Sequence, residues 1–347
     1  MTKLKFRAVK RGFSLIELMV AMGILSVLML MMTVLLDQVQ QSWRYSESRI
    51  SQFREARVAF DLISKSISQA SLNTYFDLDD KDGDGIFDQY YRTSELHFQT
   101  MEAARLTDVS GNQTPVGHAV FFQAPLGFST NYRNLNNLFN GRGYFVAYGP
   151  DTRFRPAFID SPPNYRFRLM EFRPPAESNQ VFEDGALERE QGMPQEFTQW
   201  FKQSVPNVGD SADFEEHLNP LAKNILTLVV SPRDSPVSSS GGRDDNYSEI
   251  ARYYSFDSND SDPDFASYSQ QVPPLVRLTM VAIDEEAGSR FEEGSSIPDL
   301  MPQGYFTDTA KYQSDIENLT DSLNEKRVNH KIFSTMVMLR SAKWSVN

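Results

Sequence analysis

The chain has 347 residues, no cysteine, and 46 acidic against 34 basic side chains, which gives a formal net charge of −12. The lack of cysteine excludes disulfides and thiol chemistry. The excess of acid argues against nucleic acid as a partner and fits a soluble extracytoplasmic domain, and the length accommodates a stalk and one sizeable domain.

The chain begins with a basic leader and a long apolar run. Residues 1–12 hold five basic side chains and no acid: Lys3, Lys5, Arg7, Lys10 and Arg11. From Phe13 to Leu36 the only ionisable side chain is Glu17. A helix of this length measures about 36 Å, enough to span the hydrocarbon core of a bilayer. We predict a transmembrane helix over residues 13–36, with the leader in the cytoplasm and everything after about residue 37 outside the inner membrane.

This stretch resembles the prepilin signal of type IV pilins and type II secretion pseudopilins, whose cleavage motif is G-F-x-x-x-E. Gly12, Phe13 and Glu17 occupy the motif positions. The resemblance implies cleavage after Gly12 by a prepilin peptidase, a membrane aspartic peptidase, and N-methylation of the new Phe13 amine. It also implies that the mature helix packs with sister pilin-like subunits in the core of a filament.

The electrostatics of Glu17 agrees with that role. A carboxylate inside a membrane helix costs about 2.5–3.5 kcal/mol, so it should have a partner. Cleavage creates an α-amino group with a pKa of about 7.7–8.0, and Glu17 of one subunit can neutralise the Phe13 amine of its neighbour, so that assembly relieves the cost. Loss of the leader lowers the net charge from −12 to −17.

Two simpler interpretations of the N-terminus compete with this one. An ordinary secretory signal has about 7–15 apolar residues followed by a small-residue cleavage site, whereas this run is longer and no such site follows it. A simple signal anchor, with Glu17 snorkelling to the interface, stays open.

Residues 37–75 are predicted to continue the helix as an amphipathic stalk, because no proline occurs before Pro115. Apolar side chains recur there at steps of three, four or seven: Val39, Trp43, Ile50, Phe53, Ala56, Phe60, Ile63 and Ile67. The stripe predicts a helix of about 60 residues in all, whose second half packs on a globular head. A free coiled coil is the alternative. Phe53–Ala70 also resembles the stalk of J-type minor pseudopilins and W-type minor pilins.

Residues 76–347 are predicted to form an extracytoplasmic α+β head, with the long helix leaning on an antiparallel sheet. The strands expected from β-branched and aromatic content are Ser94–Gln99, His118–Gln123, Gly143–Gly149, Tyr165–Glu171, Ile225–Ser231, Pro274–Asp284 and Ile332–Arg340. Later helices are expected near Pro194–Gln203 and over Lys311–Arg327. Ser204–His217 reads as a long loop, and segment 231–270, rich in Ser, Asp, Gly and Pro, as mobile or as an insertion between strands.

Several strings of the head resemble a narrower family, the Verru_Chthon cassette protein C family of prepilin-like proteins from Verrucomicrobia-type bacteria. These strings are His118–Gly127, Leu221–Ile225, Pro273–Glu285 and Leu339–Ser345. The resemblance runs over most of the chain. It implies a role in assembly or export more firmly than any reaction.

An acidic stretch at the start of the head is a candidate Ca²⁺ loop. Asp80, Asp82 and Asp84 alternate before Gly85, and Asp88 follows, so that several hard oxygens surround one turn. The twelfth position of an EF-hand would be Glu and is here Tyr91, which leaves a looser extracellular type of loop or a merely acidic surface. The run Asp257–Asp264 lacks this spacing and is predicted to be a solvated loop.

The sequence gives little support to catalysis. Its four histidines, His97, His118, His217 and His330, have no metal-ligand spacing. His97 and His118 lie in strand-like runs and are expected to be core or sheet-face residues. No nucleophile elbow, Walker loop or dinucleotide motif occurs. Two functions follow, neither enzymatic: a minor pilin or pseudopilin, and a membrane-anchored binding module that uses the prepilin route only for delivery.

Overall fold

The structure is a computed structural model, and it describes most of the chain after residue 13. The described residues are 14–80, 85–106, 113–132, 135–156, 158–178, 217–234, 250–259, 268–290, 296–302 and 304–342. The chain divides into two compact units, Met1–Ser51 and Gln52–Asn347. Each unit is described by itself.

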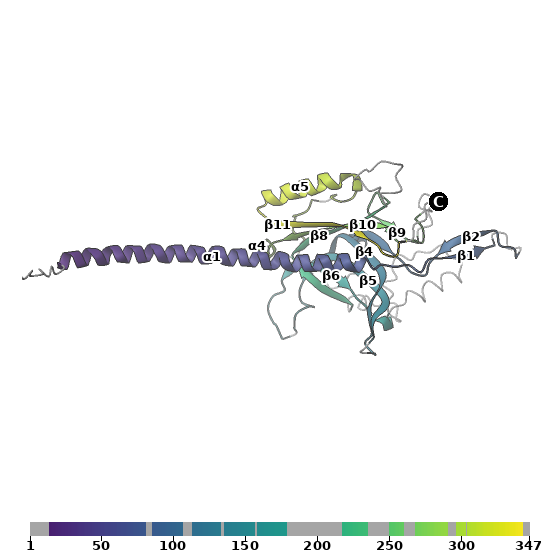
Figure 1. The fold of residues 1–347 in the computed structure, drawn as a ribbon, viewed down its shortest axis with the longest axis horizontal. Coiled ribbons are helices and arrows are strands. Elements are labelled where there is room, and N and C mark those ends of the chain that lie inside the picture. Colours follow the sequence, from purple (N-terminus) through teal and green to yellow (C-terminus); the bar gives the residue numbers. More distant parts are fainter. Residues whose placement is uncertain are drawn as a thin grey trace, which may run out of the picture. The chain divides into compact units, whose positions relative to one another are not determined.

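Helix α1 runs without interruption from Leu15 to Ile67 and contributes to both units (Figure 1). It ends eight residues before the predicted stalk boundary at residue 75. The backbone N–H of Ala70 donates a hydrogen bond to the carbonyl of Ile67 at 3.0 Å, and the backbone N–H of Ser71 donates to the carbonyl of Gln123 at 3.0 Å. The chain therefore leaves the helix to join the head, and Tyr75 already begins a strand.

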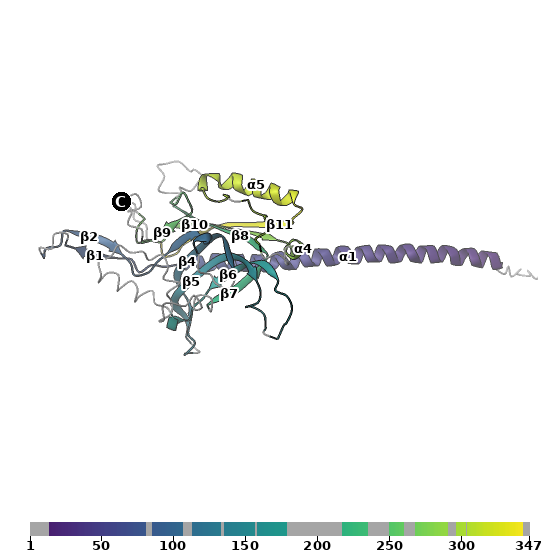
Figure 2. The same cartoon turned by 180° about the vertical axis from the view of Figure 1, so that it is seen from behind.

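The head contains eleven strands and, after α1, two short α-helices among its described residues (Figures 1 and 2). The strands are β1 (Tyr75–Asp79), β2 (Gln89–Thr93), β3 (Gln99–Glu102), β4 (Thr114–Phe128), β5 (Asn136–Pro150), β6 (Tyr165–Phe172), β7 (Leu218–Lys223), β8 (Ile225–Arg233), β9 (Phe256–Asp257), β10 (Leu275–Ile283) and β11 (His330–Met338). The helices are α4 (Glu285–Arg290) and α5 (Tyr312–Glu325). Three short 3₁₀ turns cover Ala103–Arg105, Ala176–Ser178 and Thr309–Lys311.

The strands form three sheets in which every pair is antiparallel. Six strands have the order β7-β6-β5-β4-β3-β9, and three have the order β11-β10-β8. Among the described strands, β1 and β2 pair only with each other. A long apolar helix followed by antiparallel sheets confirms the predicted α+β class.

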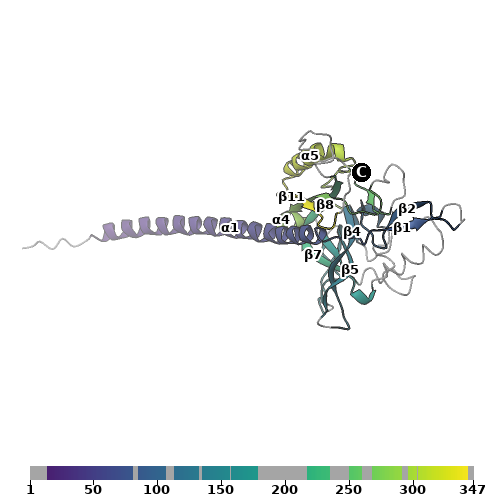
Figure 3. The same cartoon turned by 45° about the vertical axis from the view of Figure 1, so that its right-hand side comes forward.

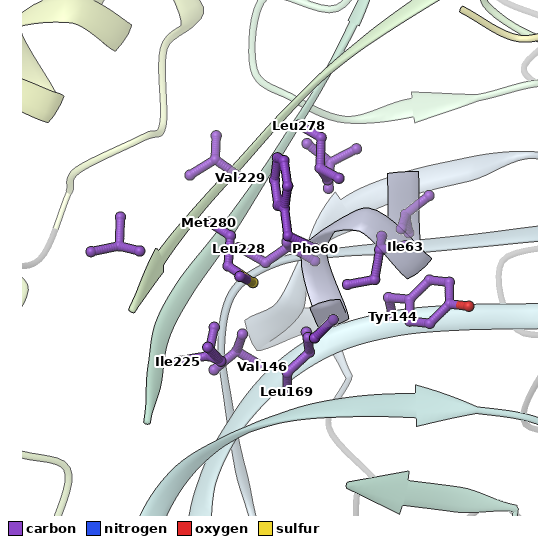
Figure 4. Packing of buried hydrophobic residues seen from close by; sticks show 14 of the residues in the cluster. Phe60, Ile63, Tyr144, Val146, Leu169, Ile225, Leu228, Val229, Leu278 and Met280 are labelled. Atoms are coloured by element: carbon purple, nitrogen blue, oxygen red, sulfur yellow. The ribbon is translucent and has the colours of Figure 1, made fainter. Parts of the chain in front are cut away.

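The second half of α1 packs on the main core of the head. The buried residues recur at helical spacing: Ala56, Ala59, Phe60, Ile63 and Ile67. Figure 4 shows Phe60 and Ile63 among side chains from β5, β6, β8 and β10. The predicted apolar stripe is thus used against the head over residues 56–67, and a free coiled coil is excluded for this part of the helix.

The six-stranded sheet is covered on both faces. Along β4, Val120 and Phe122 join the core beneath α1, whereas Ala119 and Phe121 join a second cluster with Phe145 and Phe172 on the opposite face. This period-two division follows from the alternation of side chains along a strand. Both faces are apolar, so β4 and β5 carry continuous apolar runs.

Gly117 marks a tight approach between strands β4 and β8. Its φ is +71°, and a Cβ placed there would lie 2.3 Å from Thr227 Oγ1 and 2.8 Å from the carbonyl oxygen of Leu228. Only glycine fits both the backbone conformation and the space. This residue therefore lets β4 and β8 approach each other closely.

Most predicted strands are confirmed, with one error. His118–Gln123, Gly143–Gly149, Tyr165–Glu171, Ile225–Ser231, Pro274–Asp284 and Ile332–Arg340 coincide with or overlap β4, β5, β6, β8, β10 and β11. Ser94–Gln99 is wrong, because only Gln99 belongs to a strand. Side chains satisfy the backbone there: Leu96 N–H donates to Ser94 Oγ at 3.1 Å and His97 N–H to Gln123 Oε1 at 2.7 Å. The helix predicted over Lys311–Arg327 is α5.

Two predictions fall mostly outside the described residues. The helix expected near Pro194–Gln203 lies there entirely, as does loop Ser204–His217 except for its last residue. Of segment 231–270, the described part includes Ser231–Arg233 at the end of β8 and residues 250–259. Ile250, Ala251, Tyr254 and Phe256 are buried in the core, so this stretch is part of the head.

Candidate functional site

The first turn of α1 holds Glu17 in a network with Ser14. The backbone N–H and the hydroxyl of Ser14 donate to Glu17 Oε2 at 3.0 and 3.1 Å, and Glu17 N–H donates to Ser14 Oγ at 3.3 Å. This reciprocal arrangement is a capping box, which satisfies the free donors at a helix start. Gly12 and Phe13 lie outside the described residues.

The helix that follows is exposed on every side within its own unit. Leu15–Trp43 is long and apolar enough to cross a membrane by length and composition, and the large apolar side chains from Leu15 to Leu36 are all more than half exposed. A core helix of a soluble protein would bury one face. The exposure is what a lipid-facing or subunit-facing helix requires.

Comparison with known protein families supports the prepilin interpretation of this segment. Residues 7–33 match the prokaryotic N-terminal methylation motif. The chain carries a prepilin-type N-terminus. The matched range contains Gly12, Phe13 and Glu17, whose roles in cleavage and assembly stay predictions. No curated protein and no solved structure is found to match the chain, and the narrower resemblance of the head to the Verru_Chthon family stays a prediction.

The prepilin-type motif and the apolar first part of α1 are consistent with single-pass anchoring and an extracytoplasmic head. Ser14 was not among the residues singled out from the sequence. The pattern S-x-x-E ahead of an apolar run predicts a capping box, so the signal for Ser14 was present in the sequence.

The acidic loop connects β1 to β2, and the structure describes only part of it. Asp80 accepts a hydrogen bond from the backbone N–H of Gly85 at 2.7 Å, and Gly85 has a φ of +81°. Asp88 directly precedes β2, whereas Asp82 and Asp84 lie outside the described residues. Within the described part of the chain no three His, Cys, Asp or Glu residues are grouped for a metal ion. The Ca²⁺ site stays a prediction.

His118 is a buried structural residue, as the sequence predicted. Its Nε2 donates to the carbonyl of Phe306 at 2.9 Å, and its Nδ1 accepts from the backbone N–H of Val230 at 3.2 Å. Burial lowers the pKa of His118 to about 4, so the ring is neutral. It lines a cavity of about 730 Å³ with Phe167, Leu226 and Phe306, but both ring nitrogens are occupied and neither is available as a catalytic base.

His97 is paired with Asp257, so the prediction of a solvated loop over Asp257–Asp264 is wrong at Asp257, whereas residues 260–264 lie outside the described residues. The two side chains are 2.5 Å apart at His97 Nε2 and Asp257 Oδ1, and Asp257 belongs to β9, which pairs with β3. Gln99 and the backbone N–H of Asn259 also donate to Asp257. These contacts hold β9 in place as the edge strand of the six-stranded sheet, next to β3.

Proposed function

We propose that this protein is a minor pilin or pseudopilin, a structural subunit of a type IV pilus or of an assembly related to type II secretion. It is cleaved after Gly12 by a prepilin peptidase, anchored in the inner membrane by the helix over residues 13–36, and carries its head in the periplasm or at the cell exterior. The observation that carries the proposal is the motif match over residues 7–33, with Glu17 in the first helical turn.

Glu17 supplies the driving force for assembly in this proposal. Its hydrogen-bond donors in the first turn belong to Ser14 and are uncharged. In lipid, a carboxylate held only by such donors remains costly. Pairing with the cationic Phe13 amine of a neighbouring subunit removes that cost and fixes the axial register between subunits.

The capping box gives the carboxylate a defined position before assembly. The Ser14 donors hold Oε2 at the start of the helix, so Glu17 needs no rearrangement of the helix to meet an incoming amine. Removal of the Ser14 hydroxyl should therefore weaken the helix start without removing the charge that pairs.

The experiment that tests this function compares Glu17→Gln with Ser14→Ala in the full chain. Glu17→Gln should remain membrane-inserted and cleaved, because removing a charge favours insertion, but it should lose co-purification with sister pilin-like subunits. Ser14→Ala, the matched control at the same helix start, should retain most of it. Equal co-purification of Glu17→Gln and wild type would contradict the pairing.

The second function, a membrane-anchored binding module delivered by the prepilin route, is favoured by the exposed aromatic hairpin at β1 and β2. The genomic neighbourhood separates the two. Adjacent genes for other G-F-x-x-x-E proteins and for a prepilin peptidase support the structural subunit, whereas an isolated gene supports the binding module.

A further inference from the structure

Strands β1 and β2 form a hairpin that stands apart from the two larger sheets of the head. They pair only with each other among the described strands, and Figures 1 and 3 show the hairpin extending from the side of the head. Two five-residue strands without a third strand are marginal in water. The hairpin therefore needs a firm base or a partner.

One face of the hairpin is apolar and exposed. Phe76 pairs with Arg92 and Leu78 with Tyr90 in the register, so these four side chains point to the same side. Phe76 is 68% exposed and Tyr90 is 74% exposed. Phe87, just before β2, is 62% exposed. The opposite face carries Asp77 and Tyr91, which are joined by a hydrogen bond at 3.4 Å.

This aromatic content is large for a surface exposed to water. At about 150–250 Å² for each aromatic side chain, the exposed parts of Phe76, Phe87 and Tyr90 amount to roughly 300–500 Å². The largest apolar patch of a typical monomer has about this size and is often a binding site. Here it lies on a single small hairpin.

The base of the hairpin is firmly held to the head. Thr74 Oγ1 donates to Gln270 O at 2.6 Å, Arg92 to Ser269 O at 3.1 Å, and the Tyr75 hydroxyl to Glu95 at 2.6 Å. Phe76 and Arg92 also line a hollow of about 240 Å³ at this base, together with Leu72, Thr74, Gln271, Val272 and Ser341. The apolar face thus continues into a depression with room for a side chain of a partner.

The negative charge of the hairpin favours a partner with a basic surface. Residues 75–93 contain six aspartates against Lys81 and Arg92, a net charge of −4, and Arg92 is tied to the head through Ser269. A second copy of this chain, itself strongly acidic, and an anionic lipid surface are both repelled by such a surface. A protein surface with lysines and arginines around an apolar patch is complementary to it.

We propose that the β1–β2 hairpin is a docking arm for a second protein whose surface is apolar at its centre and basic at its rim. The exposed aromatic side chains supply the buried contact, and the aspartates supply orientation and rate of association. The proposal does not depend on the pairing of Glu17, because the arm lies in the head and the pairing in the membrane helix.

Site-specific photo-crosslinking in native membranes tests the arm. In the full chain, p-benzoylphenylalanine replaces Tyr90 on the apolar face or, as control, Tyr132, which is 67% exposed on the β4–β5 connection. Position 90 should give one protein adduct, whose crosslinked peptide maps to a surface containing lysine or arginine, and position 132 should not. An adduct only to this same chain, only to phospholipid, or to no molecule at position 90 would overturn the proposal.

Two further measurements distinguish specific docking at the hairpin from nonspecific hydrophobic association. Phe76→Ser should reduce the position-90 adduct more than tenfold, whereas Phe158→Ser, at an exposed residue of the β5–β6 connection, should leave it unchanged. A zero-length carbodiimide crosslink between Asp88, which directly precedes β2, and a lysine of the same partner should form and should weaken at high salt. Equal effects of the two serine variants on the position-90 adduct would overturn the proposal. The variant Glu17→Gln, which tests pairing in the membrane helix, should preserve that adduct.

Discussion

Asp257 illustrates how a single residue joins two distant parts of the head. Burial acts to raise the pKa of its carboxyl, but the attraction of His97 and the hydrogen bonds from His97, Asn259 and Gln99 outweigh it and lower the pKa below its ordinary value. Because the folded pKa is the lower one, the ionised carboxylate stabilises the fold above the unfolded pKa of about 3.9. That stabilisation is lost as the pH falls through the folded pKa.

Asp257→Asn should therefore reduce stability in a pH-dependent way. At pH 7 we expect the free energy of unfolding to fall by about 1.5–3 kcal/mol, the range for hydrogen bonds to a charged group. The difference from wild type should shrink as the pH falls through the folded pKa of Asp257. Urea unfolding of the full chain in detergent between pH 2.5 and 7 measures it, with Asp61→Asn at an exposed position of α1 as control. A gap that persists unchanged at low pH would contradict the role of the ionised carboxylate.

Helix α1 illustrates how one secondary-structure element serves two environments. Its first part is apolar all round, and its second part buries only one face, at Phe60, Ile63 and Ile67. The change follows from the sequence, because polar side chains fill most of the remaining positions after Leu36.

Ile63→Ala should destabilise the head strongly, since Ile63 is fully buried among side chains of several strands (Figure 4). Removal of its methyl groups should lower the free energy of unfolding by about 2–5 kcal/mol through lost burial and a residual cavity. Val58→Ala on the exposed face of the same helix should change it by less than about 0.5 kcal/mol. Thermal unfolding followed by circular dichroism compares them, and similar losses for both variants would show that the helix does not pack by this face.

The β1–β2 hairpin carries the predicted Ca²⁺ loop, which metal titration tests. If Asp80, Asp82, Asp84 and Asp88 bind Ca²⁺, an ion concentration 100 times Kd should stabilise the full chain by about 2.7 kcal/mol. Mg²⁺ should do much less, because it keeps its waters and demands octahedral geometry. The double variant Asp82→Ala with Asp84→Ala should abolish the Ca²⁺-dependent rise in Tm. Equal shifts from both ions, or a shift that survives the double variant, would reduce the loop to an ordinary acidic surface.

The same elements explain what sequence patterns could predict about the fold. Runs rich in branched and aromatic residues predicted β4, β5, β6, β8, β10 and β11. All of these strands except β11 are mostly buried, and their composition reflects it. The position of β3 was wrong, and the strands β1, β2, β7 and β9 were missed. The strands β1 and β2 mix aspartate with aromatics, and β7 contains asparagine, proline and lysine. Strand β9 has only two residues. Its pairing with β3 depends on contacts more than 150 positions apart in sequence, which no local pattern contains.

At the scale of the whole molecule, the sequence was most informative where the chemistry is local. The motif at Gly12, Phe13 and Glu17 is a short string with a fixed spacing, and the match over residues 7–33 contains it. The docking surface on the hairpin was not predicted, because the exposure of Phe76 and Tyr90 depends on how the head folds. Aromatic residues in a sequence are more often buried than exposed.

Cleavage of the basic leader would change both the charge of the chain and its N-terminal group. Removal of residues 1–12 leaves a chain with a net charge of −17 and a cationic amine at the start of its helix. The central claim is that this amine exists, since assembly through Glu17 requires it.

The mass and N-terminal peptide of the protein purified from its native membrane test that claim most directly. The account predicts a chain that begins at Phe13, carries one methyl group on its amine and lacks residues 1–12. A chain that retains Met1, or one cleaved after residue 36, would contradict it.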